Sequence, residues 1–244
     1  MRINVSFVNV FKKPNSKSEV ITQILYGETF KIIERKKLFI KIKNDLDNYK
    51  GYILKKNIYS NLKNTHKVYK LNANLYNKPD FKNKIKKKLS FGSKIRVLIK
   101  KNNFCKFDNF WIKKKDLKKI NYKSKDIFKD IKKFTNVKYK WGGKHYTGVD
   151  CSGLVQLFLH FNNKYCPRDA RDQILYFKKK ISLDNVKKND LIFWKGHVAV
   201  ATSKQQLIHA YGPLKKTVVM PIKKAINRIQ KTANLKILGI RRVN

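Results

Sequence analysis

One cysteine in this chain stands between an acid and a serine, in surroundings that suggest chemistry. The segment WGGKHYTGVDCSGLVQ, residues 141–156, places Cys151 after a stretch broken by glycines and before an apolar run typical of a buried helix. We therefore predict that Cys151 lies at a helix N-terminus. The unpaired amides and the dipole there would lower the pKa of the thiol and bind an oxyanion as it forms. The alternative is a buried cysteine in a tight turn.

Two histidines further along the chain favour the catalytic interpretation. The segment that contains them reads as three successive strands, at residues 190–194, 197–202 and 206–211. If the last two strands are joined by a three-residue loop, Ala199 lies opposite His209 and His197 lies opposite Tyr211. His197 and His209 then share one face of the sheet as diagonal neighbours. A nucleophile, a base and a group that orients the base are the parts that covalent catalysis requires.

Six motifs follow one another in an order that resembles the NlpC-type cell-wall cysteine peptidases. They span roughly residues 135–242 and read YKWGG, GVDCSGLVQ, PRDARDQ, NDLIFW, HVAVA and LIHAYG. The resemblance implies an α+β fold, with a papain-like catalytic domain at residues 122–244 in which helices pack on an antiparallel sheet. It also implies that the chain hydrolyses peptidoglycan stem peptides.

The resemblance assigns three catalytic roles. Cys151 is expected to be the nucleophile, and His197 the general base that later acts as the acid for the leaving amine. His209 is expected to orient His197. No metal or other cofactor is implied, because no His, Cys and Asp residues cluster with the spacing of metal ligands.

The same resemblance suggests residues that hold the substrate. Tyr139, in the aromatic position before WGG, is expected to line the oxyanion site. Asp150 and Ser152 flank the nucleophile and are expected to hold the ammonium group of the substrate. The chain departs from the pattern at Ala170, where relatives often have a serine after PRD, so that one hydrogen bond to the substrate is in question.

The first half of the chain contains an internal repeat. Three pairs of segments match, NVFKKP with NLYNKP, ILYGETFKII with LSFGSKIRVL, and GYILKKNI with FWIKKKDL, and the second pair aligns Gly27 with Gly92. Each copy alternates apolar and polar residues, which predicts short half-buried strands. The pattern resembles bacterial SH3-like domains and predicts two small β-barrels, at residues 1–60 and 61–121.

Between the repeat and the motifs, the segment SKDIFKDIKKFTN predicts a helix. Ser124 is its expected N-cap. One apolar stripe would face the core, formed by Ile127, Phe128, Ile131 and Phe134.

The composition restricts the compartment and the partners. The chain has 244 residues, three cysteines and a formal net charge of +44. The odd cysteine count argues against a disulfide framework, and no segment has the length of a membrane span. The N-terminus lacks the pattern of a signal peptide, so a soluble, cytoplasmic monomer is expected, or a secreted or periplasmic protein if a signal has been trimmed. The charge indicates an anionic partner or a general lysine bias, and no specific nucleic-acid partner is expected.

These observations leave several functions open. The leading hypothesis is a peptidase similar to the dipeptidyl-peptidase VI branch, which cleaves γ-D-glutamyl bonds to a diamino acid in muropeptides with a free N-terminal L-Ala, as in recycling of cell-wall peptides. The alternatives are a secreted autolysin that cuts intact wall and a non-catalytic SH3-like wall-binding protein. A nucleic-acid binder rests on charge alone.

Overall fold

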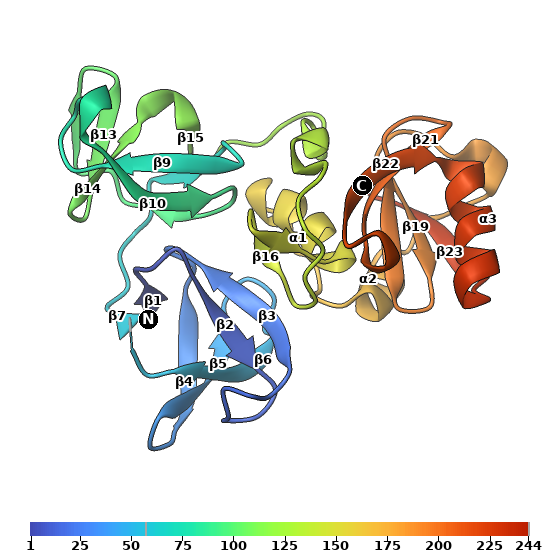
Figure 1. The fold of residues 1–244 in the computed structure, drawn as a ribbon, viewed down its shortest axis with the longest axis horizontal. Coiled ribbons are helices and arrows are strands. Elements are labelled where there is room, and N and C mark those ends of the chain that lie inside the picture. Colours follow the sequence, from blue (N-terminus) through green and yellow to red (C-terminus); the bar gives the residue numbers. More distant parts are fainter. Residues whose placement is uncertain (57, 244) are drawn as a thin grey trace. The chain divides into compact units, whose positions relative to one another are not determined.

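The computed structural model describes residues 1–56 and 58–243, which form two compact units (Figure 1). The first unit comprises Met1–Lys123 together with Lys144–Tyr146, and the second comprises Ser124–Gly143 and Thr147–Asn244. Within the described residues, no helix combines the length and apolar character needed to cross a bilayer.

The first copy of the repeat forms a five-stranded antiparallel sheet. Its strand order is β3-β2-β6-β5-β4, with bounds β2 (Phe7–Phe11), β3 (Val20–Leu25), β4 (Phe30–Arg35), β5 (Phe39–Asn44) and β6 (Lys50–Leu54). A short ladder joins β1 (Arg2–Ile3) to β7 (Ile58–Tyr59). Apolar residues from the inward positions of these strands make the core, because alternate side chains of a strand point to one face.

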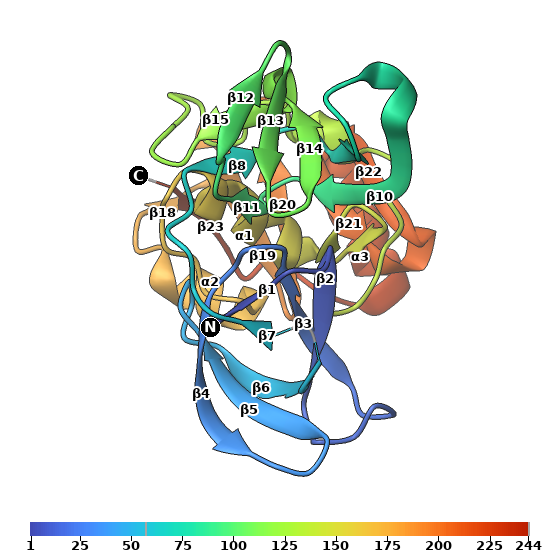
Figure 2. The same ribbon diagram turned by 90° about the vertical axis from the view of Figure 1, so that its left-hand side faces the viewer.

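The second copy repeats this topology. Its five-stranded sheet has the order β10-β9-β14-β13-β12, which is the order of the first sheet with each strand replaced by its counterpart. Figure 2 shows β12, β13 and β14 of this sheet side by side. The bounds are β9 (Asn72–Tyr76), η1 (Phe81–Asn83), β10 (Lys84–Ser90), β12 (Ile99–Lys101), β13 (Phe104–Phe107) and β14 (Phe110–Lys113). A three-stranded sheet accompanies it, made of β8 (His66–Val68), β11 (Lys94–Ile95) and β15 (Leu117–Lys119), with η2 (Lys114–Asp116) before β15. The internal repeat is therefore visible in the fold.

The aligned glycines of the two copies have the same backbone conformation. Gly27 has φ +72° and Gly92 has φ +87°, in the left-handed region that L side chains rarely adopt. At Gly27 the space is also restricted, because a Cβ atom would overlap the carbonyl oxygen of Lys94. This turn thus requires glycine for two separate reasons.

The second unit is built on a six-stranded antiparallel sheet. The strand order is β18-β23-β19-β20-β21-β22, with bounds β18 (Lys180–Ile181), β19 (Asp190–Trp194), β20 (His197–Ala201), β21 (Gln206–Tyr211), β22 (Lys216–Pro221) and β23 (Gly239–Arg242). The helices are α1 (Cys151–Phe161), α2 (Ala170–Tyr176) and α3 (Ile222–Ala233), with short 3-10 turns η3 (Ile131–Phe134), η4 (Leu183–Asn185) and η5 (Gly212–Leu214). Figure 1 shows α1 and α2 on one side of the sheet and α3 on the other. The short strand β17 (Gly148–Val149) precedes α1, while β16 (Lys144–His145) belongs to the first unit.

Helix α1 is buried along its whole length, as the apolar run predicts. It packs against β20 and β21. The predicted strands at 190–194 and 206–211 are confirmed, and the strand predicted at 197–202 ends one residue earlier. The sheet therefore holds the start of α1 beside the strand that begins with His197.

The helix predicted from Ser124 is wrong. The segment contains only the turn η3, because Asp130 has φ +62° and interrupts any helix. Ser124 does not cap a helix: its N–H donates to the side chain of Asn162, which also donates to the carbonyl oxygen of Ile127. The apolar stripe nevertheless reaches the core at Phe128, Ile131 and Phe134.

The requirement for glycine at Gly27 can be measured against Gly196. Gly196 has nearly the same angle, φ +71°, but open space where its Cβ would be. We expect Gly27→Ala to lower the free energy of unfolding of its unit by about 3 kcal/mol and Gly196→Ala by about 1 kcal/mol, because only the first adds a steric clash to the backbone strain. Chemical denaturation of both variants tests this, and equal losses would contradict the role assigned to the Lys94 carbonyl.

Candidate active site

The start of helix α1 is fixed by the carboxylate of Asp150, its N-cap. One oxygen, Oδ1, accepts a hydrogen bond of 2.7 Å from the backbone N–H of Gly153. The other, Oδ2, accepts one of 2.8 Å from the N–H of Gly142, in the glycine-containing loop. The first bond satisfies one of the amides that a helix start leaves unpaired, and the second ties the loop to the helix. Cys151 is therefore the first residue of α1, as predicted.

A buried arginine holds the same carboxylate. Arg168 donates two hydrogen bonds to Asp150, of 3.0 Å to Oδ1 and 2.6 Å to Oδ2, and a third of 2.9 Å to the hydroxyl of Ser152. The side chains of Arg168 and Asp150 are only 1% and 6% exposed. This bidentate, buried ion pair orders both side chains. Because water does not reach either group, neither charge would be solvated if its partner were removed.

Sequence reasoning missed Arg168. The motif PRDARDQ contains it, and a buried arginine always needs an anionic or carbonyl partner, but the sequence does not say which acid it meets. The structure also bears on the substrate-binding role predicted for Asp150 and Ser152. Both side chains are already bonded to Arg168, so a substrate ammonium would share the carboxylate with it. The substrate-binding role of Asp150 and Ser152 stays a prediction, in which the ammonium group would share the carboxylate with Arg168.

The side chain of Cys151, the first residue of α1, is buried. The sulfur accepts backbone hydrogen bonds from Ser152 and Val198, which favour a thiolate, but burial and the negative charge of Asp150 act more strongly in the opposite direction. Together they raise the pKa of Cys151 to about 12. The lowered pKa expected from a helix N-terminus is therefore wrong for this environment, because burial first, and then the capping acid, outweigh the backbone amides.

The two histidines form a hydrogen-bonded pair. The pairs Val200–Ile208 and Ala201–Leu207 set the register of β20 and β21, which is the predicted one. Nε2 of His197 lies 2.9 Å from Nδ1 of His209. Burial, the largest cause in each case, lowers the pKa of His197 to about 4 and that of His209 to about 3. Both rings are therefore neutral at pH 7, which is the form a general base must have.

Aromatic rings support this pair. Tyr211 stacks on His209 with ring centroids 4.7 Å apart and planes only 9° from parallel. Its ring centroid is also 5.8 Å from that of His197, and Trp194 lies 5.7 Å from His197. The predicted pairing register placed Tyr211 opposite His197, but its stacking on His209 was not foreseen.

Tyr139 lies in the electrostatic field of Cys151, Asp150 and Arg168. Its pKa is raised by burial first, and then by the negative charges that Cys151, when ionised, and Asp150 carry, while Arg168 opposes the shift. Its hydroxyl therefore stays protonated and is able to donate a hydrogen bond. Its ring packs beside Gly212, where a Cβ atom would come within 3.5 Å. These properties suit the predicted oxyanion role, which stays a prediction.

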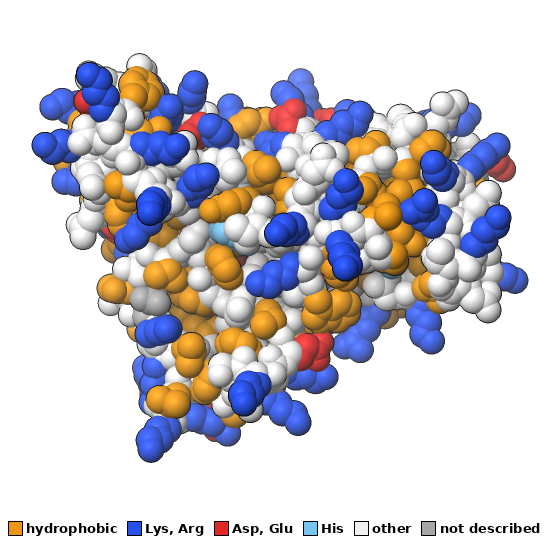
Figure 3. All heavy atoms as spheres, viewed as in Figure 1, with side chains coloured by type: hydrophobic (Ala, Val, Ile, Leu, Met, Phe, Trp, Pro, Cys, Tyr) orange, Lys and Arg blue, Asp and Glu red, His pale blue; other side chains and the backbone are white. Residues whose placement is uncertain are grey.

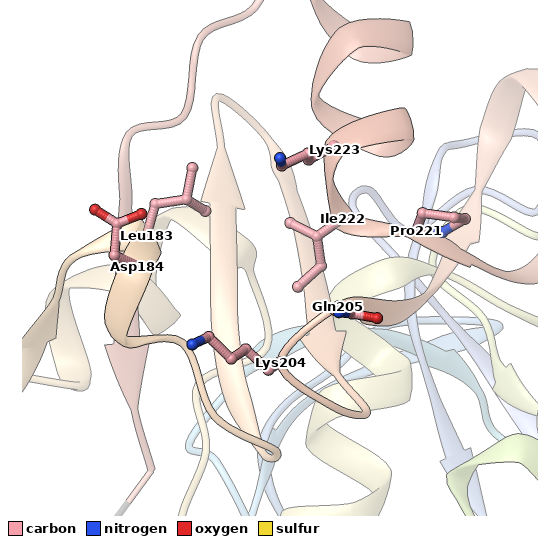
Figure 4. Close-up of a pocket in the computed structure, with 7 residues that line it drawn as sticks. All are labelled: Leu183, Asp184, Lys204, Gln205, Pro221, Ile222 and Lys223. Atoms are coloured by element: carbon pink, nitrogen blue, oxygen red, sulfur yellow. The ribbon is translucent and has the colours of Figure 1, made fainter.

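A separate hollow in the second unit contains none of these residues. This pocket has a volume of about 580 Å³. Figure 4 shows its lining, in which the side chains of Leu183 and Ile222 lie near Lys204 and Lys223. None of the predicted catalytic or substrate-binding residues lines it. No group of three or more His, Cys, Asp or Glu residues within 1–56 and 58–243 is arranged to hold a metal ion.

Comparison with known proteins identifies two domains. Residues 136–232 match the NlpC/P60 family and residues 6–59 match the bacterial SH3 domain. The chain therefore contains an NlpC/P60 domain and a bacterial SH3 domain. The second copy of the repeat has no such match among these findings, so its assignment as an SH3-like barrel stays a prediction.

A curated protein and two solved structures are similar to the chain. Dipeptidyl-peptidase 6 of Lysinibacillus sphaericus is 40% identical over 72 residues, which are 30% of this chain and 27% of that protein. An NlpC/P60 family protein from Bacillus cereus ATCC 10987 has a TM-score of 0.82 at 19% identity, covering 99% of this chain and 98% of that one. An NlpC/P60 endopeptidase from Photobacterium damselae subsp. piscicida has a TM-score of 0.63 at 16% identity, covering 97% and 70%. These structures establish the papain-like NlpC/P60 fold, whereas the curated match spans about a quarter of that relative.

The buried pair of Arg168 and Asp150 can be tested by removing one partner. We expect Arg168→Met to lower the free energy of unfolding by about 3 to 5 kcal/mol, because it leaves the Asp150 charge buried without a counter-ion. Arg171→Met, which breaks the exposed pair with Asp172, is the matched control and should change stability by less than about 0.5 kcal/mol. Denaturant unfolding measures both.

The double variant Asp150→Asn/Arg168→Met separates charge from packing. It should recover part of the stability lost in Arg168→Met, because no uncompensated carboxylate remains. A double variant less stable than Arg168→Met would show that the pair acts through packing alone.

Proposed function

We propose that this chain, which carries an NlpC/P60 domain, is a cysteine peptidase that hydrolyses γ-D-glutamyl bonds to a diamino acid in peptidoglycan stem peptides. The observation that carries the proposal is the arrangement of one thiol and two neutral imidazoles. Cys151 begins α1, its sulfur accepts the N–H of Val198, and His197, the neighbour of Val198, is bonded to His209. These are the parts of a thiol peptidase in the order in which they act.

The pKa values suggest how the thiol is activated. A neutral thiol and a neutral imidazole do not form an ion pair before substrate binds, so in this proposal His197 takes the proton of Cys151 as the sulfur attacks the carbonyl carbon. His209 stabilises the resulting imidazolium through the 2.9 Å hydrogen bond. His197 then gives the proton to the leaving amine, and water releases the acyl group from the sulfur. Tyr139 is the proposed donor to the oxyanion.

The match to a protein named dipeptidyl-peptidase 6 supports the finer substrate assignment. In this proposal the ammonium group of an N-terminal L-Ala approaches Asp150 and shares its carboxylate with Arg168. A need for a free amine would confine the enzyme to peptides already released from the wall. The proposal therefore includes a role in recycling muropeptides in the cytoplasm.

Hydrolysis of a defined tripeptide tests the proposal. We expect the protein to release the dipeptide from L-Ala-γ-D-Glu-diaminopimelate and to lose at least about a thousandfold in kcat/KM when that substrate is N-acetylated, because the amine loses its charge. Cys151→Ala should abolish the reaction, and Cys166→Ala, which removes a buried thiol outside the proposed site, is the matched control.

The other outcomes identify the alternatives. Equal cleavage of both substrates would support an autolysin that cuts intact wall. If neither substrate is cleaved and Cys151→Ala is indistinguishable from the parent, the chain is a binding protein and the proposal fails.

A further inference from the structure

Two adjoining hollows lie on the second copy of the repeat, within the first unit. One has a volume of about 610 Å³ and the other about 370 Å³. They share Lys114, Leu117 and Lys118, which come from η2 and β15. The two hollows therefore adjoin along these residues, and their combined lining is referred to here as the lysine face.

The lining of the lysine face is cationic. Six lysines contribute to it, Lys100, Lys113, Lys114, Lys115, Lys118 and Lys119. Within the described part of the chain, none of the six has a carboxylate oxygen within 4.0 Å, whereas Lys12 and Lys188 pair with Glu19 and Asp126. The acid of the same segment, Asp116, is only 4% exposed and so lies beneath the surface. Asp116 also interacts with Lys113 and Lys115, whose charges oppose the rise in its pKa that burial causes. One buried acid therefore faces six lysines, and the remaining positive charge is left for a ligand to neutralise.

Aromatic rings, in place of acids, hold two of these ammonium groups. The Nζ atom of Lys113 lies 4.4 Å from the ring centroid of Phe81, and that of Lys118 lies 5.1 Å from Tyr69 and 5.2 Å from Tyr122. A cation over a ring is held in place without losing its charge, so less ordering is needed when an anion binds.

The histidine beside these lysines reports their field. His66 lines the smaller hollow, and its pKa is lowered by burial first and then by Lys100 and Lys119. The lysine face therefore has a positive potential that extends to a neighbouring titratable group.

The chemistry of the lining selects among anionic ligands. Lysine ammonium groups bind phosphate as point charges. Arginine recognises base edges through two parallel hydrogen bonds, and no arginine lines either hollow. Single-stranded nucleic acids are held by a positive groove along the backbone together with stacking of bases on aromatic faces. Here the faces of Phe81 and Tyr122 are covered by Lys113 and Lys118. The lysine face therefore suits a chain of anionic groups better than a series of stacked bases.

We propose that the lysine face binds a linear polymer of phosphate groups that carries no bases. Several anionic groups in a row would contact lysines from both hollows, with Lys114 and Lys118 at their junction. The site is independent of Cys151 and would add a partner to the chain without changing the proposed reaction.

The main competing explanation is the general charge of the protein. Lys and Arg side chains are spread over the whole face seen in Figure 3, with few acids among them. A matched control is available on β10, where Lys84, Lys86 and Lys87 lie in the same repeat outside both hollows. Lys87 also lies over a ring, 4.8 Å from the centroid of Phe110, so the control retains the same kind of contact.

Binding of linear polyphosphate tests the proposal. Calorimetry with chains of about 15 phosphates would compare the parent with Lys113→Gln/Lys114→Gln/Lys118→Gln and with Lys84→Gln/Lys86→Gln/Lys87→Gln. We expect the first variant to bind about tenfold more weakly and the control to change less than about threefold. The slope of log K against log salt should fall by about 2 in the first variant, because three phosphate contacts are lost. Circular dichroism checks that both variants are folded.

Three results would overturn the proposal. If both variants weaken binding equally, net charge alone attracts the polymer. If oligothymidylate of equal charge binds more tightly than polyphosphate and is equally sensitive to the first variant, the surface is a nucleic-acid site. If polyphosphate does not bind the parent at 0.1 M salt, where charges more than about 10 Å apart are screened, the lysine face is only solvated.

Discussion

The carboxylate of Asp150 is the constraint on which the site depends. It accepts hydrogen bonds from Gly142, from Gly153 at the start of α1, and from buried Arg168. These contacts fix three separate segments against one another: the glycine-containing loop, the first turn of the helix, and the chain before α2. The position of Cys151 follows from this arrangement, because it is the residue next to the cap. A helix start that is held in this way presents its thiol in one orientation at little further cost in entropy.

The same carboxylate also contributes to the electrostatics. Burial of the sulfur, and after it the charge of Asp150, raise the pKa of Cys151, while burial lowers the pKa of both histidines. The result is a thiol and an imidazole that are both neutral at rest, in contrast to an ion pair formed in advance. The lowered histidine pKa values also affect stability. The unfolded rings bind protons near pH 6.5, whereas the folded rings do not. The histidines therefore leave the free energy of unfolding undiminished above that pH and lower it as the pH falls from 6.5 towards 4.

Local patterns in the sequence predicted much of this fold. The start of α1 follows from the change from glycines to an apolar run, and the β20–β21 register follows from the short loop between the two strands. Both signals depend on residues that are close in the chain. The failures involve contacts with residues that are distant in it. The helix expected at Ser124 is interrupted by Asp130, which has φ +62°, and its first backbone groups bond to the side chain of Asn162 instead. Arg168 is recognisable only when its partner is known, and the pKa of Cys151 depends on a burial that no sequence pattern reports.

The central claim is that the Cys151 thiol is neutral at rest and depends on His197 for activation. The most direct measurement is the rate at which a neutral alkylating reagent, chloroacetamide, labels Cys151, followed by mass spectrometry across the pH range, with buried Cys105 and Cys166 as internal references. The account predicts a rate that keeps rising with pH and reaches no plateau below about pH 10, because the thiolate forms only near the raised pKa. A rate that is already constant between about pH 5 and 8 would show a thiolate held beside an imidazolium, and would contradict the account.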